Sequence, residues 1–102
     1  MSTIAVAVNE NLPAIPWGIT ASSSGNVIVI TWGQLVGDDI STIRIYRSEP
    51  GQQAKATGTV DAVTGEFTDK NVSKGKLYFY QLSSVNKNGN EGMLSEKISI
   101  RL

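Results

Sequence analysis

The 102-residue sequence contains no cysteine and no histidine. Without cysteine the chain can form neither a disulfide bond nor a thiolate metal site. Histidine is the commonest general base and metal ligand, so its absence excludes a hydrolase triad of the usual serine, histidine and aspartate kind. We therefore expect a protein that is not an enzyme and that carries no cofactor.

Excess charge and long apolar runs are also missing. Lysine plus arginine and aspartate plus glutamate number nine each, so the net charge is zero. Such a chain has no long-range field to attract nucleic acid or an anionic membrane. No run approaches the ~18 apolar residues that span a bilayer. Residues 1–8 lack the lysine or arginine that begins a signal peptide. We therefore expect no nucleic-acid partner and no membrane partner.

Short stretches of alternating apolar and polar residues make up most of the chain, and a helical period appears nowhere. The expected strands cover residues 17–21, 26–32, 40–48, 54–60 and 65–68, part of residues 75–89, and a last segment that contains Ile98 and Ile100. Turn residues separate them, as in 22–26. About seven short strands with turn signals every ~8–12 residues predict an all-β fold, an immunoglobulin-like β-sandwich of about seven antiparallel strands.

Several segments in order resemble the fibronectin type III family, in particular its bacterial and phage members. They are a proline-led first strand over residues 16–21, Trp32 on the second strand, the segment IRIYRS over 43–48, the turn Phe67-Thr68-Asp69, and the strand GKLYFYQLSSVNKNG over 75–89. The resemblance covers residues 13–102, which we take as one domain, and leaves residues 1–12 as an N-terminal arm.

The resemblance implies fibronectin type III topology and a specific set of core residues. Tyr78 would be the tyrosine-corner residue, whose hydroxyl bonds to a backbone group near Val72. The side chains expected in the core are Ile30, Trp32, Ile45, Tyr78, Tyr80 and Leu82.

An exposed aromatic patch is the first candidate for partner binding. If Ile45 and Tyr80 point inward, alternation along their strands sends Tyr46 and Phe79 outward, and Val85 lies on the same outward side. Exposed apolar patches with aromatic residues mark protein interfaces. The alternative is that the aromatic side chains only stabilise cross-strand pairs.

The N-terminal arm is the second candidate. Ile4, Val6 and Val8 alternate with small or polar residues and precede two prolines, which suits strand addition at the edge of a neighbouring subunit. The alternatives are that the arm extends the first strand of its own domain, or that it has no fixed structure.

Asp38 and Asp39 are adjacent carboxylates that lack further oxygen ligands at a suitable spacing. We therefore predict a turn there, and no metal site.

Together these patterns predict a non-catalytic structural or protein-interaction domain whose partners are subunits of a larger assembly. The first hypothesis is a component of a phage virion, such as a tail, baseplate or capsid-surface protein, made in the host cytoplasm. The alternative is a spacer or accessory module of a secreted bacterial carbohydrate-active enzyme or adhesin. Fold alone does not separate these two settings.

Overall fold

Seven strands and no helix form the secondary structure of the computed structural model, which describes residues 12–35 and 39–102. The strands are β1 (Thr20–Ser24), β2 (Val27–Thr31), β3 (Ile40–Ser48), β4 (Lys55–Asp61), β5 (Glu66–Asp69), β6 (Leu77–Asn86) and β7 (Ile98–Arg101). Every pairing between them is antiparallel. The expected all-β class is therefore confirmed. In the same described ranges, no helix is long and apolar enough to cross a membrane.

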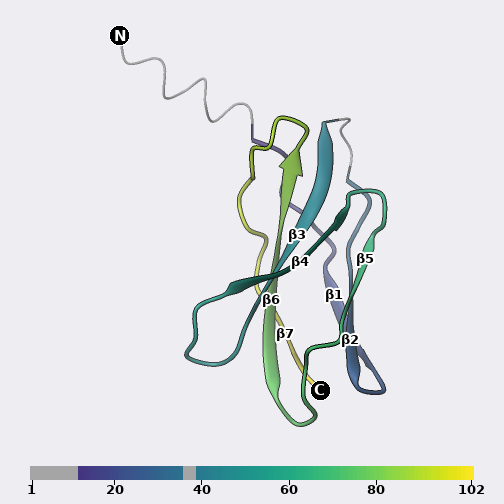
Figure 1. Ribbon diagram of the computed structural model, residues 1–102, viewed down its shortest axis with the longest axis vertical. Coiled ribbons are helices and arrows are strands. Elements are labelled where there is room, and N and C mark those ends of the chain that lie inside the picture. Colours follow the sequence, from purple (N-terminus) through teal and green to yellow (C-terminus); the bar gives the residue numbers. More distant parts are fainter. Residues whose placement is uncertain (1–11, 36–38) are drawn as a thin grey trace.

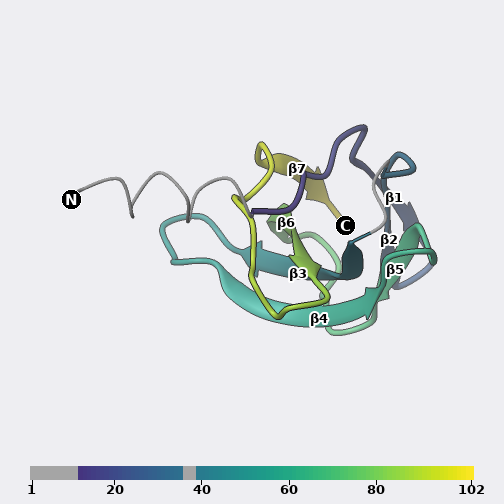
Figure 2. The same ribbon diagram turned by 90° about the horizontal axis from the view of Figure 1, so that it is seen from above.

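The strands form two sheets that lie face to face (Figures 1 and 2). One sheet has three strands in the order β1-β2-β5, and the other has four in the order β4-β3-β6-β7. Side chains alternate between the two faces of each strand, so every second residue points into the space between the sheets. The result is the predicted sandwich.

The first hairpin differs from the sequence prediction. We expected a strand over 17–21 and a turn over 22–26, but β1 begins at Thr20 and continues through Ser24, which pairs with Val27. Only Gly25 and Asn26 form the turn, and Gly25 has a φ of 61°. A two-residue hairpin turn favours glycine at this position. Serine has a low intrinsic preference for strands. The three serines nevertheless join β1, because pairing with β2 satisfies the hydrogen bonds of their backbone groups.

The core lies between the sheets and draws its side chains from both of them. Of the residues expected there, Ile30, Ile45, Tyr80 and Leu82 have no exposed surface, Tyr78 is 2% exposed and Trp32 is 8% exposed. Ile28 and Ile43 are equally buried and join the same cluster. Each fully buried side chain of this size contributes about 1.5–3 kcal/mol to stability before chain entropy is subtracted.

The tyrosine corner closes the connection that precedes β6. The backbone N–H of Ser73 donates a hydrogen bond to the hydroxyl of Tyr78 at 2.8 Å. Ser73 directly follows Val72, near which the resemblance implied that the bond would lie. The bond ties the connection between β5 and β6 to the second residue of β6.

Asp69 forms a buried polar link between the sheets that the sequence analysis missed. This carboxylate, at the end of β5, is 1% exposed. It accepts hydrogen bonds from the Arg47 guanidinium of β3 at 2.7 Å and from the Tyr80 hydroxyl of β6 at 2.8 Å. The backbone N–H of Asn71 donates a third at 3.1 Å. Burial, and then the bond to Asp69, raise the pKa of Tyr80 well above its ordinary value.

Candidate functional site

The outer face of the four-stranded sheet carries the two aromatic residues of the predicted patch. Tyr46 of β3 lies opposite Gln81, and Phe79 of β6 lies opposite Ser48, so the two rings share a face and are offset by two residues along it. Both are partly buried. The structure therefore brings Tyr46 and Phe79 to the same surface.

Neither ring forms a bare apolar surface, however. The Tyr46 hydroxyl donates a hydrogen bond to the carboxylate of Glu91. The ammonium of Lys97 lies 5.6 Å from the centroid of the Phe79 ring, within range of a cation–π interaction. Polar and charged groups thus occupy the positions that an apolar partner surface would need.

Val85 departs from the prediction because it is only 8% exposed. Glu91 pairs with Val85 in an isolated β-bridge. Next to it, the backbone oxygen of Asn86 accepts a hydrogen bond from the N–H of Gly89, and the N–H of Asn86 donates one to the backbone oxygen of Asn90. The chain after β6 thus turns back over this end of the strand. Val85 is therefore buried, and the exposed patch does not include it.

Glu91 is the centre of a polar cluster on the outer face. Its carboxylate accepts hydrogen bonds from Arg44 at 2.8 Å, from Ser83 at 2.6 Å, and from Tyr46. Burial by itself raises the pKa of this carboxyl. The hydrogen bonds from Ser83 and Tyr46, followed by the charge of the arginine, outweigh burial and bring the pKa of Glu91 below its ordinary value. The cluster holds the loop after β6 against the sheet.

The other predicted binding residues, Ile4, Val6 and Val8, lie outside the described residues, and the arm remains a hypothesis. Asp38 lies outside them too, and its neighbour Asp39 is exposed. Within residues 12–35 and 39–102, no group of three or more histidine, cysteine, aspartate or glutamate side chains is placed to hold a metal ion.

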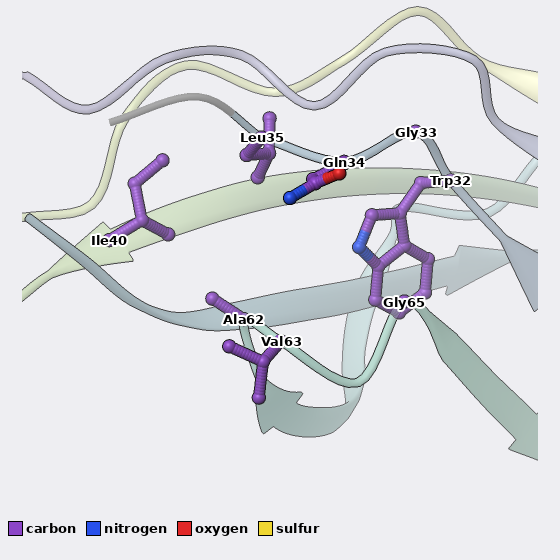
Figure 3. A pocket seen from close by; sticks show the side chains of 8 residues that line it. All are labelled: Trp32, Gly33, Gln34, Leu35, Ile40, Ala62, Val63 and Gly65. Carbon is purple, nitrogen blue, oxygen red and sulfur yellow. The ribbon is translucent and has the colours of Figure 1, made fainter. Parts of the chain in front are cut away.

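A cavity of about 360 Å³ opens between the chain that follows β2 and the turn that joins β4 to β5. Figure 3 shows Trp32 at one end, Ile40 at the other, and Ala62 and Val63 facing Leu35 across it. The residues that line it are Trp32, Gly33, Gln34, Leu35, Ile40, Ala62, Val63 and Gly65. None of these side chains is charged, so the described residues of the cavity supply neither a general acid nor a general base.

Trp17 stands beside this cavity with its indole largely in solvent. It is 59% exposed, and its Nε1 donates a hydrogen bond to the backbone oxygen of Gln34 at 3.2 Å. The N–H of Gly33 donates to the backbone oxygen of Trp17 at 2.8 Å. The strand expected over residues 17–21 includes Trp17, whereas β1 begins at Thr20. Its contact with Gly33 depends on how β1 and β2 pair, which no local pattern reveals.

No protein-family model matches the chain. Among solved structures, an Fn3-like protein from Clostridium thermocellum is 29% identical, with a TM-score of 0.73, and the alignment covers 89% of this chain and 94% of that one. The chain has the fibronectin type III fold. The predicted fibronectin type III topology is thereby confirmed.

Two larger enzymes are similar to this chain over a small part of their own length. An amylopullulanase of Thermoanaerobacterium saccharolyticum is 34% identical over 85 residues, which are 81% of this chain and 6% of the enzyme. A β-1,2-glucanase from Parabacteroides distasonis is 25% identical, with a TM-score of 0.74 over 89% of this chain and 14% of that structure. The fibronectin type III chain described here thus spans only a small part of the length of these relatives.

Proposed function

We propose that this chain is a non-catalytic accessory module of a secreted bacterial carbohydrate-active enzyme. The observation that carries the proposal is the 34% identity to a segment of an amylopullulanase that extends over 81% of this chain. The likeness to a β-1,2-glucanase points in the same direction. This is the alternative that the sequence analysis left open. The relatives found give no support to the first hypothesis, a virion component made in a host cytoplasm.

The chemistry of the described residues supports a non-catalytic role. Hydrolysis of a glycosidic bond ordinarily needs two carboxyl groups that flank the bond. Among the described residues that line the cavity beside Trp32 there is no carboxylate. The best-buried carboxylate, Asp69, is bound to Arg47 and Tyr80 inside the sandwich, where no substrate reaches it. We therefore assign hydrolysis to other parts of the enzyme.

Within this proposal, Tyr46 and Phe79 do not form an apolar binding patch on their own. Their face is the outer side of β3 and β6, and its groups are already joined through Glu91 and Lys97. Such a surface suits contact with a neighbouring domain through its polar rim more than through an apolar centre.

A hydrolysis assay tests the non-catalytic part of the proposal. The purified chain is incubated with starch, with pullulan and with β-1,2-glucan, and released reducing ends are measured. We expect no release above that of a chain heated until unfolded. Release that persists through successive purification steps and disappears on unfolding would overturn the proposal.

A further inference from the structure

The exposed indole of Trp17 and the neighbouring residue Gln34, whose backbone oxygen accepts a hydrogen bond from the indole Nε1, form a surface with the properties of a sugar-binding platform. We propose that this surface binds a neutral glucan chain, with Trp17 stacking on the face of a sugar ring and Gln34 bonding to its hydroxyls. The proposal builds on the accessory-module function and assigns it a ligand class.

The indole lies flat against the backbone. A Cβ atom built on Gly33 would lie 2.5 to 2.7 Å from three neighbouring atoms of the six-membered part of the indole ring. Nearly equal distances to three adjacent ring atoms place that point over the ring rather than at its edge. One face of the indole therefore covers Gly33, and the exposed area of Trp17, 59%, belongs largely to the other face and the rim.

Two bonds hold the ring in this orientation. Nε1 donates to the backbone oxygen of Gln34, and the backbone oxygen of Trp17 accepts from Gly33. A ring that is already fixed loses little conformational freedom when a ligand covers it. Glycine at position 33 is part of this arrangement, because any side chain there would displace the indole.

The surroundings of the ring favour a neutral, hydroxyl-rich ligand. Gln34 is exposed, and its amide offers both a donor and an acceptor to hydroxyl groups. Gly33 and Gln34 also line the cavity, and none of the described residues that line it is charged. Its volume of about 360 Å³ lies at the lower end of the range of ~300–1,000 Å³ seen for ligand pockets.

A pyranose ring matches these features because its axial C–H groups form an apolar face while its hydroxyls lie around the rim. The apolar face fits a flat indole, and the hydroxyls fit an amide.

The main alternative to a glucan as the ligand is another protein domain, because other apolar side chains are also exposed. Leu12 and Ile15 are 40% and 47% exposed, and Met93 and Leu94 are 64% and 43% exposed. A protein domain that binds through exposed apolar side chains would use several of these residues in addition to Trp17. A glucan on the indole would not need Met93, which makes Met93 a suitable control.

The test is affinity electrophoresis of the purified chain in native gels that contain soluble starch, pullulan, laminarin or polygalacturonate. We compare the parent with Trp17→Ala, Trp17→Phe, Gly33→Ala and Met93→Ala, and near- and far-ultraviolet circular dichroism verifies that each variant is folded. Titration with maltoheptaose provides a second readout, because a bound sugar would shield the indole of Trp17 from quenching by acrylamide. The buried Trp32 gives the internal reference.

We expect at least one of the three neutral glucans to retard the parent and Met93→Ala equally. Trp17→Ala should bind about tenfold more weakly, and Trp17→Phe and Gly33→Ala should fall between. Absence of retardation in every neutral glucan would overturn the proposal, as would retardation by polygalacturonate alone. Equal loss in Trp17→Ala and Met93→Ala would also overturn it, because glucan binding would then not depend on the indole of Trp17 in particular. None of these results would contradict an accessory module that acts as a spacer.

Discussion

Replacement of Asp69 by alanine should destabilise this domain more than any other single change of a polar side chain that we consider. The carboxylate is 1% exposed and accepts three hydrogen bonds. Its loss leaves the Arg47 side chain, which is 23% exposed, without its counterion inside the sandwich. It also leaves the hydroxyl of the fully buried Tyr80 without its acceptor.

The magnitude follows from these contacts. Breaking a buried ion pair by removing one partner costs about 3–5 kcal/mol, because the remaining charge stays buried and uncompensated. Arg47 keeps some solvent contact and lies 5.5 Å from the centroid of the Tyr78 ring, so we expect the lower end, about 3 kcal/mol. Small domains have only about 5–15 kcal/mol of stability. At about 4–8 °C per kcal/mol, the melting temperature should fall by at least about 12 °C.

Urea unfolding, followed by circular dichroism and by the fluorescence of the buried Trp32, measures the change. Asp61→Ala is the matched control, since Asp61 is exposed on β4 and should change stability by less than about 0.5 kcal/mol. A double-mutant cycle with Arg47→Met and Asp69→Asn should give a coupling energy within about 0.5–3 kcal/mol. A loss below about 1 kcal/mol in Asp69→Ala would refute the reasoning, because the carboxylate would then not be the acceptor on which the link between the sheets depends.

Three further predictions concern single side chains. Ser84→Ala should raise the free energy of unfolding by about 1 kcal/mol, because the Ser84 hydroxyl is fully buried and has no hydrogen-bond partner among the described residues; a loss of stability in urea unfolding would contradict this. Tyr78→Phe should cost about 1–3 kcal/mol because it leaves the Ser73 N–H without its acceptor, and an unchanged urea midpoint would show that water replaces the bond. Glu91 has a lowered pKa when folded, so its carboxylate stabilises the domain above the unfolded pKa of about 4.3, and that stabilisation disappears as the pH falls through the folded value. Melting curves from pH 7 to pH 3 should therefore show a steeper loss for the parent than for Glu91→Gln, and parallel losses would contradict the role of Glu91.

Local patterns in the sequence were sufficient for the strands that pair over their whole length. Alternation in residues 40–48 predicted the bounds of β3, and the apolar period of Tyr78, Tyr80 and Leu82 predicted which face of β6 is buried. Both predictions succeed because a strand with one buried face has a strong register preference. The resemblance to the fibronectin type III family added the tyrosine corner.

Contacts between distant segments could not be predicted in this way. Asp69 resembled an ordinary turn residue, and its burial depends on Arg47 and Tyr80 arriving from the opposite sheet. Val85 continued an outward-facing pattern, but it is buried at the end of β6, where the chain returns and Glu91 pairs with it. These features depend on three-dimensional packing, which the period of a single strand does not encode.

The candidate glucan platform has the same origin. Trp17 and Gly33 are sixteen positions apart, and nothing in either neighbourhood signals that an indole lies flat over a glycine. A sequence pattern identifies the tryptophan, but only the paired strands give its orientation and exposure. The polar uncharged character of Gln34 becomes meaningful only beside that ring.

The size and location of the native polypeptide test the central claim most directly. Antibodies raised against this chain are used on culture medium, on cell lysate and on purified phage particles of the source organism, and the reacting bands are identified by mass spectrometry. An accessory module predicts a secreted polypeptide much larger than 10.9 kDa whose peptides include glycoside-hydrolase sequences. A band of about 10.9 kDa that occurs in phage particles and is absent from the medium would contradict the account.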